Sequence, residues 1–208
     1  MGRGMGISLE SMAIAMPSVL GHPNRVAFRG VLTTVDSPSD KAPAGARGHR
    51  VMLTRAAAEA AIPSLLGMGL DYSPRLDGHD ARRKIGVITK AEVIGREIEI
   101  AGFLYGRDFP EMVEEIGKAP GRDQPGAGSR GRAGNGFGSS SRIRTTGSDR
   151  ATHDQAGLGM SYEIADAVVE DIKAEVWVLN RVTFTGAAVL RRDKAAYKAT
   201  WIELEPGV

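Results

Sequence analysis

Residues 119–156 contain almost no large apolar side chains. This feature constrains the fold more than any other, because the segment cannot contribute to an apolar core. It is rich in glycine, serine and arginine. Such a segment cannot bury enough surface to offset the entropy lost on ordering it, so we predict that it is a disordered insert. The flanking parts, 25–118 and 157–204, must then share one core, and we expect 1–24 to be a flexible N-terminal arm.

Composition excludes several classes of protein. The chain has no cysteine, which excludes a disulfide scaffold and a cysteine nucleophile. Its 27 basic and 25 acidic residues give a net charge of +2, which favours neither a nucleic acid nor a membrane partner. No apolar run reaches the roughly 18–20 residues of a membrane span. No His, Asp and Glu set has metal-ligand spacing, so we expect no metal or other cofactor.

Apolar and β-branched patterns on both sides of the insert predict strands, most of them paired as hairpins. We expect these strands at 25–35, 50–53, 85–91, 94–104, 160–169, 174–185 and 200–204. Thr54 is a suitable cap for a helix over 55–66, interrupted at Pro63, and a second helix is expected over 109–117. The pattern predicts an α+β fold, a small and mostly antiparallel β-barrel flanked by two or three helices.

Two single residues are the candidates for chemistry. His79 lies in a polar loop that we predict over 71–80, and Ser161 follows a Gly-Leu-Gly-Met turn at the start of a strand. A serine hydroxyl becomes a good nucleophile only when a neighbouring base takes its proton, so a Ser/His pair is the smallest useful acyl-transfer site. Each residue alone also fits a structural role, as a surface loop histidine and a strand-start serine.

A histidine base needs a polar partner on its other ring nitrogen. Asp80 is adjacent to His79 in sequence, and adjacent residues rarely orient one another well. Asp71, Asp77 and Asp166 are more distant alternatives, and the sequence does not choose among them. The other histidines are weaker candidates for the base. They lie in Pro/Gly loops or in the insert, and are His22, His49 and His153.

Taken in order, five stretches resemble the prohead maturation serine proteases of tailed bacteriophages, whose fold is similar to that of the herpesvirus assemblins. The resemblance as a whole extends over about 140 of the 208 residues, and these stretches carry it: Arg25-Val-Ala-Phe-Arg-Gly-Val-Leu, Gly78-His79-Asp80 with Lys84-Ile-Gly-Val, Ala101-Gly-Phe-Leu-Tyr with the helix from Phe109 to Ile116, Leu158-Gly-Met-Ser161-Tyr-Glu-Ile, and Val182-Thr-Phe-Thr-Gly-Ala-Ala-Val-Leu. The chain departs from that family in its long insert and in having Tyr162-Glu163 after the serine.

The resemblance implies a serine endopeptidase with Ser161 as nucleophile and His79 as base. Its expected substrates are scaffold and major capsid protein segments, cleaved inside the viral procapsid in the host cytoplasm; a homo-oligomer is left open. If residue 169 paired with 174, Arg181 and Val182 would lie opposite Ser161, and Arg181 would help backbone N–H groups hold an oxyanion. The alternatives are an inactive relative that serves as a capsid-interior or scaffolding protein, and a β-barrel module that binds nucleic acid through its Arg/Gly-rich segment.

Overall fold

The computed structural model describes residues 22–118 and 157–205. The insert predicted at 119–156 lies outside the described residues, as does the predicted arm up to residue 21. The described end of that arm is tied to the domain, because Asn24 accepts hydrogen bonds from the backbone N–H groups of Gly106 and Arg107.

The elements follow one another in the order β1 (Arg25–Thr34), β2 (Arg50–Leu53), α1 (Arg55–Ala61), the 3-10 helix η1 (Ile62–Leu65), β3 (Gly69–Tyr72), β4 (Lys84–Ile94), β5 (Glu97–Tyr105), α2 (Pro110–Lys118), β6 (Leu158–Val169), β7 (Val176–Arg191) and β8 (Trp201–Leu204). In the described residues, neither α-helix is long and apolar enough to cross a lipid bilayer.

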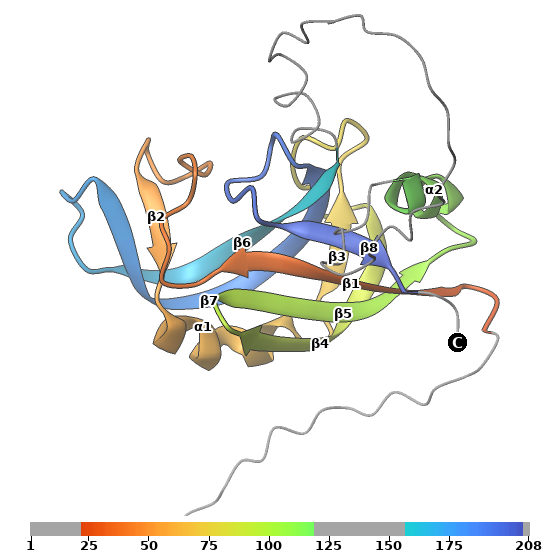
Figure 1. Ribbon diagram of the computed structural model, residues 1–208, viewed down its shortest axis with the longest axis horizontal. Coiled ribbons are helices and arrows are strands. Elements are labelled where there is room, and N and C mark those ends of the chain that lie inside the picture. The colour runs from red at the N-terminus through yellow and green to blue at the C-terminus, as the bar shows by residue number, and fades with distance from the viewer. Residues whose placement is uncertain (1–21, 119–156, 206–208) are drawn as a thin grey trace, which may run out of the picture.

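Within this part of the chain, eight strands form one sheet that curls into a half-barrel (Figure 1). Its hydrogen-bonded order is β2-β7-β3-β4-β5-β1-β8, and β6 pairs with β7 as well. The strands β2 and β3 run parallel to β7, and the other pairings are antiparallel. The predicted α+β class with a mostly antiparallel sheet is confirmed.

The curl encloses an apolar core to which strands on both sides of the insert contribute. Its fully buried side chains include Phe28, Leu32, Leu70, Ile88, Leu104 and Met160. The helix α1 lies against β7, and α2 lies against β8 (Figure 1). The Tyr72 hydroxyl donates to Glu111 at 3.0 Å and so joins β3 to α2.

Two predicted boundaries need correction. The helix expected over 55–66 is α-helical only to Ala61 and continues as η1, because Pro63 has no N–H to donate. The polar loop expected over 71–80 is shorter, because β3 continues through Asp71 and Tyr72. Asp71 is 1% exposed, although a carboxylate in a loop is normally solvated.

The register expected for the second hairpin is wrong. Val169 pairs with Leu179 and not with residue 174, and Ser161 lies opposite Ala188. The connection is wider than a tight turn: the Glu170 N–H donates to the Val178 carbonyl, and the first residues of β7 pair with β2. Arg181 consequently lies opposite Val168, near the far end of the hairpin from Ser161.

Candidate active site

The strand register brings Ser161 and Asp71 to one face of the sheet. Ala188 on β7 is the antiparallel partner of Ser161 on β6 and the parallel partner of Asp71 on β3. Side chains of paired residues project from the same face, so the serine and the aspartate flank Ala188. Adjacent strands are about 4.8 Å apart, which leaves a gap of about 10 Å that one imidazole can span.

The imidazole of His79 comes from the loop between β3 and β4. That loop is held by its own polar groups: Ser73 and Asp77 share a hydrogen bond of 2.7 Å, and Asp80 accepts from the backbone N–H of Arg82. The Leu76 carbonyl also accepts from the backbone N–H of Arg191 at the end of β7. These contacts fix the loop over the sheet.

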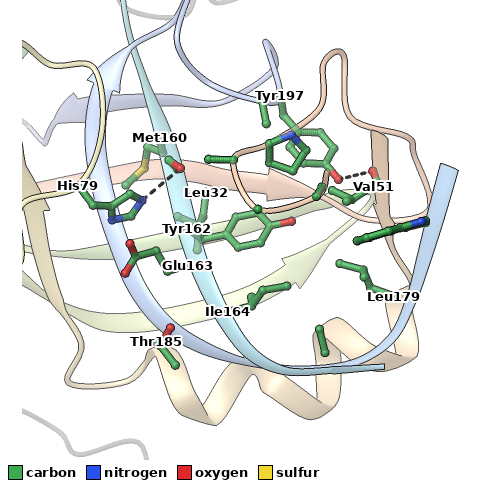
Figure 2. A pocket seen from close by; sticks show the side chains of 18 of the residues that line it. Leu32, Val51, His79, Met160, Tyr162, Glu163, Ile164, Leu179, Thr185 and Tyr197 are labelled. Atoms are coloured by element: carbon green, nitrogen blue, oxygen red, sulfur yellow. Dashed lines mark hydrogen bonds between the residues drawn. The ribbon is translucent and has the colours of Figure 1, made fainter. Parts of the chain in front are cut away.

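The predicted proximity of the two candidate residues is confirmed. His79 Nε2 lies 3.2 Å from Ser161 Oγ, within hydrogen-bonding distance (Figure 2). The other ring nitrogen, Nδ1, is buried and lies 3.4 Å from Asp71 Oδ1. That second contact is electrostatic and too poorly aligned to be a hydrogen bond, as is common for catalytic groups before substrate binds.

Asp71 is the partner that the sequence left undecided. Burial alone would raise the pKa of its carboxyl, but contacts with His79 and Lys84 outweigh burial and leave that pKa below its usual value. Lys84 donates to Oδ2 at 2.9 Å, and the backbone N–H of Asp80 donates to Oδ1 at 3.3 Å. Asp71 is therefore held as a fixed anion beneath the imidazole.

The other acidic candidates are engaged elsewhere. Asp77 is bonded to Ser73, Asp80 contacts Arg82 and Arg83, and Asp166 accepts from Thr183. Two of the remaining histidines are also placed away from Ser161. The ring of His49 stacks on Trp177, and His22 accepts from the Asn24 backbone. His153 lies outside the described residues.

A cavity of about 570 Å³ opens beside the pair. It runs along β6, and its walls are mainly apolar, including Leu32, Val51, Ile164, Leu179 and Trp177. Figure 2 shows the Tyr162 ring extending into this cavity, whereas Glu163 points toward the side that holds His79. The size and lining suit one or two apolar side chains of a bound chain.

The Tyr197 hydroxyl donates to the Val51 carbonyl at 2.9 Å at the cavity wall (Figure 2). Burial raises the pKa of both Tyr162 and Tyr197, so these phenols stay neutral at physiological pH.

On either side of Ser161, the backbone N–H groups point away from β7. Met160 N donates to Thr200 Oγ1, on the side of β6 away from β7. Because donors alternate along an antiparallel ladder, the Ser161 N–H points to β7 and the Tyr162 N–H points away from it. The observed register removes Arg181 from any role at an oxyanion, and leaves Tyr162 N–H as the nearby donor.

Among the described residues, no group of three or more histidine and acidic side chains is placed to hold a metal ion. No model of a protein family matches the chain, and no curated protein matches it. The similarity to prohead proteases therefore rests on the sequence motifs described above.

Proposed function

We propose that the protein is a serine endopeptidase whose reacting groups are Ser161, His79 and Asp71. The observation that carries this proposal is that His79 lies between the other two groups, with Ser161 Oγ at 3.2 Å from one ring nitrogen and Asp71 Oδ1 at 3.4 Å from the other, while His79 and Ser161 line the cavity. A hydroxyl, an imidazole and a buried carboxylate in that order form the arrangement that activates serine for acyl transfer.

Asp71 favours the imidazole tautomer that carries its proton on Nδ1, so that Nε2 is free to accept. As the Ser161 oxygen forms a bond to the scissile carbonyl carbon, its proton passes to His79 Nε2. The carbonyl oxygen becomes an oxyanion held by the Tyr162 N–H. His79 then protonates the amine as the C–N bond breaks. In the second half of the reaction, His79 takes a proton from water as the water oxygen attacks the acyl carbon, and it returns the proton to Ser161 Oγ as the ester bond breaks.

The biological setting follows from the sequence resemblance alone. We propose that the substrates are scaffold and major capsid protein segments, cut during maturation of a phage procapsid. This setting is consistent with a mainly apolar cavity of about 570 Å³ beside Ser161, which has room for side chains of a bound peptide.

A fluorophosphonate probe tests the proposed chemistry without knowledge of the substrate. We expect the wild-type protein to form one covalent adduct, located at Ser161 by peptide mass spectrometry. Ser161→Ala should give no adduct, and His79→Ala should react at least a hundredfold more slowly. A wild-type protein that does not react would refute the proposal and leave the inactive capsid-interior protein as the better hypothesis.

Salt-dependent binding of nucleic acid, abolished by removal of 119–156, would instead favour the binding module.

A further inference from the structure

Glu163 is a carboxylate placed beside the Ser161–His79 pair, and residues 22–118 and 157–205 offer it no ion-pair or hydrogen-bond partner. It lies two residues after Ser161 on β6, so both side chains project from the same face, about 6–7 Å apart along the strand. Glu163 is exposed, and no described side chain forms an ion pair or hydrogen bond with its carboxylate. Figure 2 shows it directed to the same side of the cavity as the His79 ring.

The opposing residue on β7 gives this side chain its position. Gly186 is the register partner of Glu163, and a Cβ atom at Gly186 would lie 2.7 Å from Glu163 Oε2. The carboxylate therefore rests over the bare backbone of Gly186, in space that any larger residue would fill. A side chain at position 186 would push the end of the Glu163 side chain out of this place.

Within the part of the chain that the structure describes, no positive side chain at the cavity balances the charge of Glu163. Among the described residues that line the cavity, Glu163 is the single carboxylate, and none is lysine or arginine. Asp71, the other nearby anion, is already paired with Lys84. A carboxylate near Ser161 opposes the negative charge that develops on an attacked carbonyl.

We propose that Glu163 selects substrates with a lysine or arginine side chain on the residue that donates the scissile carbonyl. A cationic side chain there neutralises Glu163, which removes the repulsion and adds a charge-assisted hydrogen bond. A lysine side chain is about 6 Å long and so reaches from Ser161 to Glu163, while the apolar cavity takes an aliphatic or aromatic residue further along the peptide. This inference rests on the proposed function.

Peptidyl diphenyl phosphonates provide the test, since Ser161 Oγ displaces phenoxide from phosphorus in a single covalent step. Three probes with the sequence Ala-Leu-X would differ at X, the residue bearing phosphorus: lysine, norleucine or glutamate. We expect wild type to react about tenfold faster with lysine than with norleucine. Glu163→Gln should bring that ratio near one, and Glu163→Lys should favour the glutamate probe.

Rate ratios within one variant do not depend on how much protein is active, so partial misfolding does not obscure the result. Glu115→Gln makes the same charge change on the exposed face of α2 and should keep the wild-type ratio. Raising the salt concentration from 0.05 to 0.5 M should reduce the lysine preference of unmodified protein severalfold. The Debye length is about 10 Å at a salt concentration of about 0.1 M, which lies between these two values, so screening of Glu163 increases over this range.

Two outcomes separate the failure of the inference from the failure of the proposed function. If wild type reacts with the small fluorophosphonate but shows no lysine preference, or keeps that preference in Glu163→Gln, the assignment of Glu163 is wrong and the serine hydrolase remains. If wild type reacts with neither the fluorophosphonate nor the phosphonates, the proposed function falls and this inference falls with it.

Discussion

Asp71→Asn should remove most of the reactivity of Ser161 while preserving the shape of the site. An ion pair between imidazolium and carboxylate at 3.4 Å, the Nδ1–Oδ1 distance, contributes about 5 kcal/mol at an effective dielectric constant of 20. This attraction exists only when His79 is charged, during the attack of Ser161, so it lowers the barrier. At about 1.4 kcal/mol per factor of ten, the loss is about 10³-fold to 10⁴-fold.

The competing charge of Lys84 on the same carboxylate places the expected loss near 10³-fold. The assay measures the second-order rate constant for labelling by a fluorophosphonate at about pH 7.5. This pH is about one unit above the usual pKa of a histidine side chain. Asp166→Asn is the matched control, because Asp166 is exposed on β6 and bonded to Thr183.

Asparagine can still accept the Asp80 backbone N–H, so the loop that carries His79 should keep its structure. Circular dichroism and a thermal unfolding curve would verify this. A labelling rate within tenfold of wild type, in a folded Asp71→Asn protein, would refute the role of Asp71 as the group that orients His79.

Three further predictions follow from the same contacts. Ser161→Ala should abolish cleavage of a co-expressed capsid or scaffold substrate while changing the free energy of unfolding by less than about 1 kcal/mol, as measured by urea titration. Ala188→Val should displace the imidazole and slow fluorophosphonate labelling at least tenfold. Ala187→Val is its control, because it overpacks the opposite face of β7 at a similar cost in stability of about 1–3 kcal/mol. The folded fraction of Ala187→Val should be labelled at the wild-type rate. Because the folded pKa of Asp71 lies below its ordinary value of 3.8, its stabilising contribution is complete above about pH 4 and is lost as the pH falls through the folded pKa. The difference in unfolding free energy between wild type and Asp71→Asn should therefore shrink in acid, and a constant difference down to about pH 2 would contradict the assignment.

The features that depend on local sequence were predicted well. Apolar and β-branched patterns located seven of the eight described strands, all but β3. Thr54 caps α1 through a hydrogen bond from the Ala57 N–H, as expected from its residue type. His79 and Ser161 were identified as a pair from residue types and motif order. Their proximity of 3.2 Å agrees with that prediction, and their catalytic roles stay a proposal.

The features that depend on distant pairing could not be obtained in this way. Asp71 looks like a loop residue because Gly69 precedes it and Ser73 and Pro74 follow it. Nothing local indicates that β3 inserts beside β7. A register error also moves every residue of a strand at once. Assuming a tight turn after Val169 placed Arg181 opposite Ser161, whereas the wide turn closed by Glu170 and Val178 places Ala188 there.

The strand β7 supplies none of the proposed reacting groups, yet it determines where all of them lie. Its register partners on either side are Ser161 and Asp71, both facing Ala188, and its next residue on that face toward the N-terminus is Gly186. Alanine and glycine are the two smallest residues, so β7 forms a shallow trough between its neighbours. The imidazole occupies the trough over Ala188 and the Glu163 carboxylate occupies it over Gly186. The small residues of Gly186-Ala-Ala188 thus leave room for the proposed base, His79, and for the carboxylate that by our inference selects the substrate's charge.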